Sequence, residues 1–432
     1  MENRLDIIIF GASGFTGLHC IPYIAKLSKS DGRNLSWGVA GRSEDKLKNI
    51  LSDIGQKLEV NFDSVKIIIA DINDHDSLLN MAKQARLVIN CCGPYRLYGE
   101  AMVKACIEAG THHVDVSGEP EYMEKMQLEY HDAAVKKGVY AISACGFDSI
   151  PSDLGIVFLQ QSFSGTLNSV ETYLKCGTTD NVKGSLINYG TWQSLVHSIE
   201  NRKNLKQLRQ KLYEKIKKPP TFQPKQKFIK YPHKDDKVSG WVLPFLGADQ
   251  AVIRRSQSYF YENNNQRPIQ ASTYFVLKST LDLLLFIIFA IIFGIISYFK
   301  FGRKLLLDYP QIFTGGFISK KQPEEDTVQK TWFKVDFYAE GWKEKLENKD
   351  DQYTTPVDCK ISGRVKGNNP GYGTTCVCLV LAGIIILTEK EKLANNGNGG
   401  IFSPGAAFAK TSLIKQLNEN EVTFEVLSET DI

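Results

Sequence analysis

The chain has 432 residues, which is more than one hydrophobic core usually organises, so we expect two domains. Its 43% hydrophobic and 23% charged residues exclude a disordered chain, and a net charge of +4 is too small for a nucleic-acid-binding protein. The nine cysteines have neither the density of a disulfide framework nor zinc-site spacing, and the seven histidines add no metal-ligand motif. The composition therefore predicts a compact protein of a reducing compartment without a metal site, and the first residues resemble neither a secretory signal nor a transit peptide.

Short β-branched runs alternate with amphipathic stretches through the first 160 residues, a pattern typical of parallel strands joined by crossover helices. The expected strands are Leu5–Phe10, Leu35–Ala40, Val65–Ala70, Arg86–Asn90, His113–Val116 and Val139–Ser143. The expected helices include Glu44–Ile54, Ser77–Gln84, Glu100–Ala109 and Glu121–Lys137. Six such strands complete a doubly wound parallel sheet, so the fold class is α/β with an N-terminal Rossmann domain over residues 1–160.

The regular alternation of strand and helix patterns ends near residue 160, and we place a second α+β domain with a mixed sheet at 161–400. Its expected strands are Ser169–Cys176, Thr331–Tyr338 and Val357–Val365, of which the second alternates in the manner of an antiparallel strand with both faces partly covered. Asn201–Lys218 reads as a strongly basic helix, and Thr374–Thr388 is apolar enough for a buried one.

The segment after the first strand carries three glycines spaced as GxxGxxG. Gly11 permits the sharp turn, Gly14 lets the backbone approach a pyrophosphate, and Gly17 lets the helix pack close to the strand. The N–H groups at the helix start receive the phosphate charge, and two hydroxyl groups can add donors. The expected cofactor contacts here are Gly11, Ser13, Gly14, Phe15, Thr16 and Gly17. The alternative is a glycine-rich turn without a ligand.

The end of the second strand holds Arg42 where a carboxylate usually binds the ribose of NAD. A guanidinium there can bind a 2′-phosphate through two hydrogen bonds, with Ser43 as a second contact. NADP(H) is therefore the expected cofactor. The alternatives are that Arg42 is a solvated surface residue, or that the site also accepts NAD(H).

Two further strand ends complete the expected cofactor site. Asp71, after the third strand, is placed to hydrogen-bond the adenine. The loop with Cys92, Gly93 and Pro94 follows the fourth strand and is expected to pass over the nicotinamide ribose. The thiol of Cys92 is expected to be a packing group rather than a redox group.

Three residues are candidates for the proton donor of a hydride-transfer reaction: Tyr95, Glu119 and Asp148. Each lies in a polar cluster after an expected strand, where it would face the cofactor edge. Spacing alone does not choose among them, because Ser, Asp and Pro in such clusters are also what helix starts prefer.

The motifs GASGFTG, AGRS, NCCGPYRLYGE, DVSGE and GFDSIPSD, followed by GGIFSPGAAF near the C-terminus, together resemble the saccharopine dehydrogenase-like oxidoreductases over nearly the whole chain. The resemblance implies a Rossmann domain, a mixed-sheet second domain, a C-terminal segment 401–432 returning to the first domain, and association with lipid droplets and membranes. The wider family includes trans-acting enoyl reductases of glycolipid assembly, which implies a lipid-like substrate. No arginine cluster indicates saccharopine itself as the substrate.

Leu283–Phe299 is a run of 17 residues without a charge, followed by the basic residues Lys300, Arg303 and Lys304. As a helix it would be about 25 Å long, short of the roughly 30 Å hydrocarbon core of a bilayer. A buried core helix is the alternative, and a single crossing would separate residues 305–432 from the sheet they are expected to complete. We therefore expect this segment to associate with a membrane or lipid droplet by monotopic or hairpin insertion from the cytosolic face.

Two functions are consistent with these features. The first is an NAD(P)-dependent oxidoreductase that transfers hydride to or from a lipid-like substrate at a lipid droplet or membrane surface. The second is a non-catalytic scaffold protein on lipid surfaces that retains the nucleotide fold. The sequence leaves the oligomeric state open, with a homodimer as one possibility.

Overall fold

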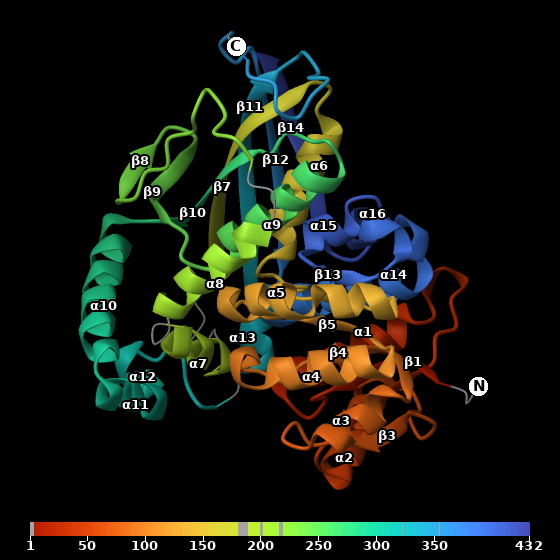
Figure 1. Cartoon of the computed structure of the whole chain (residues 1–432). Coiled ribbons are helices and arrows are strands. Elements are labelled where there is room, and N and C mark those ends of the chain that lie inside the picture. The colour runs from red at the N-terminus through yellow and green to blue at the C-terminus, as the bar shows by residue number, and fades with distance from the viewer. Residues whose placement is uncertain (1–3, 180–188, 199–201, 216–218, 322, 354) are drawn as a thin grey trace. The chain divides into compact units, whose positions relative to one another are not determined.

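The chain divides into two compact units. A computed structural model describes residues 4–179, 189–198, 202–215, 219–321, 323–353 and 355–432. The first unit comprises 1–147 with 372–420, and the second comprises 148–371 with 421–432 (Figure 1). This division differs from the expected domains 1–160, 161–400 and 401–432, because residues 372–400 group with the first unit, and residues 148–160 and 421–432 group with the second. The limits of independently folding domains stay a prediction.

The sheet of the first unit is the doubly wound parallel sheet that the sequence predicts. Its strands lie in the order β13-β6-β5-β4-β1-β2-β3, and every neighbouring pair is parallel. They are β1 (Leu5–Phe10), β2 (Trp37–Gly41), β3 (Lys66–Ile69), β4 (Ala85–Asn90), β5 (His112–Asp115), β6 (Tyr140–Ile142) and β13 (Gly400–Phe402). The six expected strands are present, and the short β13 adds a seventh that the sequence analysis missed.

Helices fill both faces of this sheet, which is why strands such as β1 read as continuous apolar runs. The helices are α1 (Phe15–Leu27), α2 (Glu44–Leu58), α3 (His75–Ala82), α4 (Tyr95–Ala109), α5 (Pro120–Lys137), α14 (Thr375–Thr388), α15 (Pro404–Phe408) and α16 (Leu413–Asn418). α4 packs between α3 and α5, whereas α14 packs against α1, β4 and β5. The expected buried helix is thus confirmed: α14 is buried from Thr375 to Ile386, and it completes the core of the first unit rather than that of the second.

The second unit is built on a mixed sheet in the order β14-β12-β11-β7-β10-β9-β8. The strands are β7 (Thr166–Thr178), β8 (His233–Asp235), β9 (Val238–Pro244), β10 (Gln270–Leu277), β11 (Thr331–Trp342), β12 (Cys359–Asn368) and β14 (Val422–Asp431). β7 and β10 are parallel and the other pairs antiparallel. β14 joins this sheet, so residues 421–432 group with the second unit, whereas residues 401–420 of the expected returning segment group with the first.

Helices α6 (Ile150–Ser162) and α9 (Asp249–Asn263) pack against each other and against this sheet. The expected alternation in β11 is confirmed in part: Phe333, Val335 and Phe337 are buried while Lys334 and Tyr338 are half-buried. Asp336 departs from it, because this carboxylate is buried and forms an ion pair with Arg364. The expected basic helix is α8 (Arg202–Lys215), and residues 201 and 216–218 of that prediction lie outside the described residues. The remaining helices are α7 (Tyr189–Ser198), α11 (Lys300–Asp308), α12 (Pro310–Phe313) and α13 (Glu325–Gln329).

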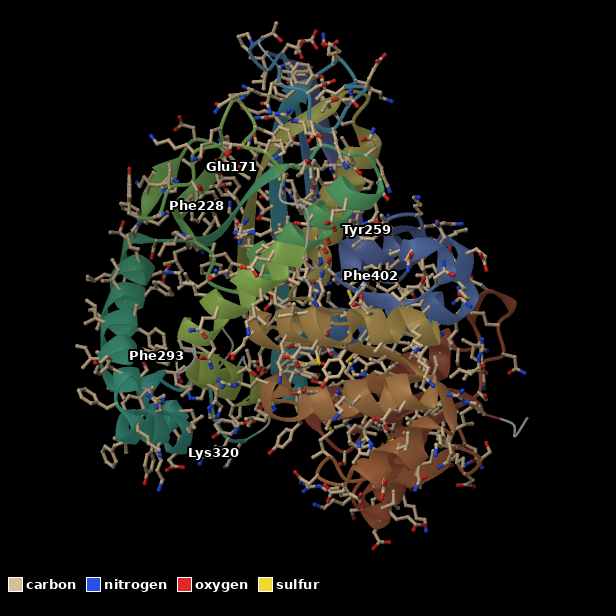
Figure 2. The ribbon with its side chains drawn as sticks, in the orientation of Figure 1. Glu171, Phe228, Tyr259, Phe293, Lys320 and Phe402 are labelled. Carbon is tan, nitrogen blue, oxygen red and sulfur yellow. The ribbon has the colours of Figure 1, made fainter. Side chains whose placement is uncertain are left out.

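The apolar run forms α10 (Thr280–Tyr298), which begins at a capping box made by Ser279 and Asp282. One face of α10 packs against α7: the rings of Trp192 and Phe293 lie 5.3 Å apart, and Phe293 points toward that helix (Figure 2). The opposite face is apolar but exposed. Its exposed side chains include Leu284, Leu285, Ile288, Ile291, Ile292 and Ile295. α10 is therefore not a buried core helix, in contrast to α14, which is also apolar but buried.

Candidate dinucleotide-binding site

The glycine loop between β1 and α1 has the tight geometry that its spacing predicts. Gly11 has a φ of +80°, in the region that favours glycine, and an added Cβ would lie 2.6 Å from the sulfur of Cys92. At Gly17 an added Cβ would lie 2.3 Å from the carbonyl oxygen of Gly11. At Gly14 it would meet only that same oxygen, at 3.2 Å. The loop is thus packed tightly on its inner side and open beside Gly14.

The open side of this loop coincides with the start of α1. Among the described residues, no side chain caps this end of the helix, and its first turn holds no acidic residue. A helix start carries N–H groups without internal partners and a partial positive charge, both of which suit a phosphate group. Ser13 is exposed there, whereas Phe15 packs edge-to-face on Tyr372 with 4.1 Å between ring centroids. The carbonyl oxygen of Thr16 accepts a hydrogen bond from the thiol of Cys376, 3.6 Å away.

Arg42 follows β2 and is exposed beside the glycine loop. The positive charge of Arg42 favours the thiolate form of Cys92. A Cβ added to the neighbouring Gly41 would lie 3.7 Å from the hydroxyl oxygen of Ser13, which places the end of β2 beside the glycine loop. In the part of the chain that the structure describes, no carboxylate forms an ion pair with Arg42. Ser43 caps α2 by accepting a hydrogen bond from the backbone N–H of Lys46 at 3.4 Å. An exposed guanidinium without a carboxylate partner fits a 2′-phosphate.

The remaining expected cofactor contacts lie at the ends of β3 and β4. Asp71 starts a turn in which its Oδ1 accepts hydrogen bonds from the backbone and side-chain N–H groups of Asn73. The backbone N–H of Cys92 donates to the side chain of Asn90 at 3.0 Å, and Gly93 and Pro94 lead into α4. Burial raises the pKa of the Cys92 thiol to about 12, so the thiol is neutral at physiological pH. A contact between these residues and the cofactor stays a prediction.

Tyr95 and Glu119 contact each other in the first unit, where both hold backbone groups. The carboxylate of Glu119 accepts the N–H groups of Tyr95 at 3.0 Å and Arg96 at 3.1 Å, at the start of α4. The hydroxyl of Tyr95 donates to the carbonyl oxygen of Asn90 at 2.9 Å, and burial raises its pKa well above the usual range. These contacts position the chain at the start of α4. A proton-donor role for Tyr95 or Glu119 stays a prediction.

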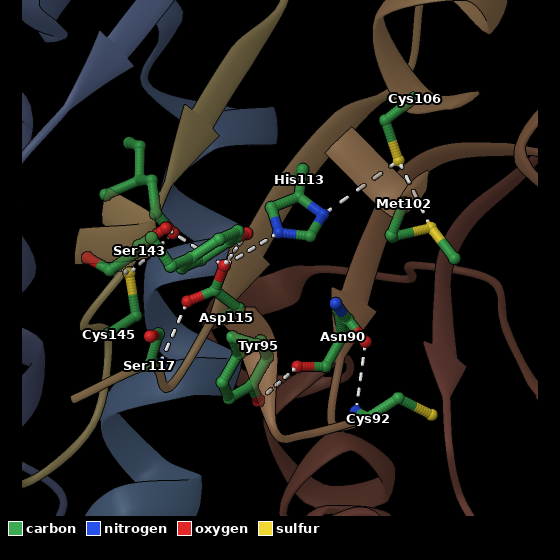
Figure 3. Close-up of polar contacts among 12 residues, drawn as sticks. Asn90, Cys92, Tyr95, Met102, Cys106, His113, Asp115, Ser117, Ser143 and Cys145 are labelled. Atoms are coloured by element: carbon green, nitrogen blue, oxygen red, sulfur yellow. Dashed lines mark hydrogen bonds and ion pairs between the residues drawn. The ribbon is translucent and has the colours of Figure 1, made fainter. Parts of the chain in front are cut away.

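A buried network around Asp115 ties together the ends of β5 and β6 (Figure 3). The carboxylate of Asp115 accepts hydrogen bonds of 2.9 Å from Tyr122 and Ser143 and from the backbone N–H of Ser117. The Nε2 atom of His113 lies 2.9 Å from the same carboxylate. A buried carboxylate must be satisfied in this way. The network holds the polar loop before α5 in place, which the sequence analysis did not foresee.

Asp148 belongs to the second unit and lies just before α6. Its carboxyl group contacts that of Asp249, the first residue of α9, and accepts a hydrogen bond from Ser149 at 3.1 Å. One oxygen of Asp249 accepts from Ser152, and the other is buried without a donor among the described residues. Burial and the neighbouring Asp249 raise the pKa of Asp148 well above its usual range. A proton shared by the two carboxyl groups satisfies this arrangement.

Asp249 was missed by the sequence analysis. The sequence around Asp249 gives no signal of a functional role, because aspartate is common at helix starts and its partner Asp148 lies about a hundred residues earlier in the chain. Among the described residues, no group of three or more histidine, cysteine or acidic side chains has the arrangement of a metal site.

Comparison with known proteins places this chain in a family. Residues 7–142 match the saccharopine dehydrogenase NADP binding domain. The chain is 38% identical to the saccharopine dehydrogenase-like oxidoreductase of Bos taurus, over 100% of this chain and 99% of the relative. It is 36% identical to the lipid droplet localized protein of Caenorhabditis elegans, over 100% of both chains.

A solved structure shares the fold. The apo saccharopine dehydrogenase (L-Glu forming) from Saccharomyces cerevisiae covers 99% of this chain and 100% of its own, with a TM-score of 0.54 and 13% identity. Because residues 7–142 match this domain, the first unit contains an NADP(H)-binding domain. By its full-length similarity to these relatives, the chain belongs to the saccharopine dehydrogenase-like oxidoreductases.

Proposed function

We propose that the protein is an NADP(H)-dependent oxidoreductase that acts on a lipid-like substrate at the surface of a lipid droplet or membrane. The observation that carries this proposal is an exposed apolar helix in a chain that also has an NADP-binding domain. Membership of an oxidoreductase family supports the class of reaction. The name of the worm relative supports the lipid surface.

The glycine loop and the second strand end would hold the cofactor. The backbone N–H groups at the start of α1 would bind the pyrophosphate, and Arg42 with Ser43 would bind the 2′-phosphate of the adenosine ribose. When bound, the cofactor supplies the hydride for reduction of a C=O, C=N or C=C bond. The tight packing at Gly11 and Gly17 would keep the loop in the shape that this binding requires.

Asp148 is the proton donor that we favour among the three candidates. A general acid must hold its proton before the reaction, and burial together with the neighbouring Asp249 raises the pKa of Asp148 well above its usual range. Tyr95 and Glu119 instead hold backbone groups at the ends of β4 and α4. In this proposal Asp148 gives its proton to the substrate, and Asp249 is a positioning residue that keeps the proton on Asp148 beforehand.

The attachment to lipid would use one face of α10. Phe289, Phe293 and Ile296 pack against the cluster around Trp192, so protein covers this side of the helix. A helix covered on one side suits insertion parallel to the surface, because a lone membrane span contacts lipid on all sides. The basic Lys300, Arg303 and Lys304 on α11 would then lie at headgroup level on the cytosolic face.

Turnover by the purified full-length protein tests this function. NADPH oxidation is followed at 340 nm against a panel of lipids that carry reducible carbonyl, imine and enoyl groups, with the Gly14→Val variant as the control. Turnover that the variant lacks supports the oxidoreductase. Tight NADPH binding without turnover on any member of the panel would favour the non-catalytic scaffold instead.

A further inference from the structure

A cavity in the second unit is lined by three cationic residues and, among the described residues, by no aspartate or glutamate. The cations are Arg267, Lys345 and Lys349, and amide side chains such as Asn264 and Asn348 also line it. Lysine and arginine usually occur near carboxylates on a protein surface of nearly balanced charge. Three cations around one cavity therefore indicate a site for an anion.

Arg267 gives this cavity a buried positive charge. The residue is only 5% exposed, and its guanidinium lies 4.0 Å from the ring centroid of Phe222 and 5.4 Å from that of Trp342. Burial lowers its pKa to about 10, so the group remains charged at neutral pH. A buried charge is costly unless an opposite charge or strong hydrogen bonds compensate it.

The protein compensates this charge only in part. The two terminal nitrogens of Arg267 donate to the carbonyl oxygens of Asp351 and Gln223 and to the side-chain oxygen of Asn168, at 2.7 to 3.2 Å. All three acceptors are neutral. The Nε atom is buried and has no partner among the described residues. Arg267 thus has hydrogen-bonding capacity and charge to offer a ligand.

We infer that this cavity binds a phosphoryl group, at a site separate from the dinucleotide site of the first unit. Two lysines and one arginine carry more than enough positive charge to neutralise a phosphate dianion, and a guanidinium presents donors in the geometry that phosphate oxygens accept. The half-buried Lys349 is fixed at the rim by a hydrogen bond to the carbonyl oxygen of Tyr261, and Lys345 is exposed beside it. The phosphoryl group comes either from inorganic phosphate or from the headgroup of an anionic lipid.

Calorimetric titration of the full-length protein with sodium phosphate, in HEPES at constant ionic strength, tests the site. Saturable binding is expected, and the double variant Lys345→Gln/Lys349→Gln should weaken it roughly tenfold at low salt, about threefold for each lysine. These lysines are chosen first because Arg267 joins several loops, and its replacement can unfold the protein. Lys343→Gln, a nearby exposed lysine that does not line the cavity, is the matched control and should change the affinity less than twofold.

The Arg42→Gln variant separates this site from the dinucleotide site and should bind phosphate as the wild type does. The inference is overturned by the absence of saturable binding, by unchanged affinity in the double variant, or by loss of binding in Arg42→Gln. Titration with dihexanoyl phosphatidic acid identifies the source of the phosphoryl group. Binding tighter than that of phosphate, and weakened by the same double variant, assigns the site to a lipid headgroup, whereas equal or weaker binding assigns it to the free anion.

Discussion

Replacing the exposed side chains of α10 by serine should release the protein from lipid. Ile288, Ile291 and Ile295 are 45%, 57% and 61% exposed, and they lie on the side of the helix away from Trp192. Full burial of an isoleucine side chain stabilises by about 1.5–3 kcal/mol, so inserting the exposed half of each contributes about 1 kcal/mol. The triple variant should lose about 3 kcal/mol of insertion free energy, which is roughly a hundredfold in the partition coefficient.

Flotation with phosphatidylcholine vesicles and with triacylglycerol droplets coated in the same lipid measures this partition. The matched control replaces three exposed leucines outside α10, Leu58, Leu97 and Leu246, by serine. This control should float with the wild-type protein, and both triple variants should keep the melting temperature within a few degrees. The reasoning fails if the α10 variant floats as the wild type does, or if the control is released to the same extent.

Three further predictions concern the two units. Gly14→Val should abolish NADPH binding, measured by fluorescence, because the side chain would fill the open side of the loop, while circular dichroism stays unchanged. Arg42→Asp should weaken NADPH binding roughly tenfold and shift the preference toward NADH, because an exposed phosphate contact is replaced by a ribose-hydroxyl acceptor. Asp148→Asn should make the stability of the protein depend less on pH. Folding raises the pKa of Asp148, so the stability that this carboxyl group contributes is fully present below about pH 4. That contribution is lost as the pH rises through the pKa of the folded state. The melting temperature of the variant should therefore fall less than that of the wild type between pH 5 and pH 9.

Each of these predictions has a result that contradicts it. Wild-type NADPH affinity in the Gly14 variant would remove the glycine loop from the cofactor site. An unchanged ratio of NADPH to NADH affinity would make Arg42 a solvated surface residue. Parallel melting curves of the Asp148 variant and the wild type across this pH range would show that Asp148 and Asp249 do not share a proton.

The sequence predicted the first sheet well, because its strands are apolar on both faces and are separated by recognisable turns. It missed β13, since Gly400–Phe402 is too short to show a period and pairs with β6 from the far end of the chain. It also could not orient α10. The helix is apolar all around, so only the packing partner Trp192 distinguishes the covered Phe289 from the exposed Ile288.

The expected cofactor residues could be named from the sequence because they are local: the glycines and Arg42 follow adjacent strands. The proton donor could not be chosen in this way, because the role of a carboxyl group depends on its partners. Glu119 binds the backbone of Tyr95, which lies 24 residues earlier in the sequence, and Asp148 contacts Asp249, which lies about a hundred residues later. Such contacts depend on tertiary packing, so they cannot be predicted from the spacing of residues in the sequence.

The interrupted first unit has a consequence for biosynthesis. The strands up to β6 leave the ribosome long before α14, the buried helix that covers β4 and β5. At a translation rate of roughly 5–20 residues per second, synthesis of the intervening second unit leaves that surface bare for roughly 10–45 seconds. α10 emerges within this interval. The nascent chain thus exposes the apolar helix α10 while its nucleotide-binding domain is still incomplete. In the function proposed above, attachment to lipid would therefore precede cofactor binding.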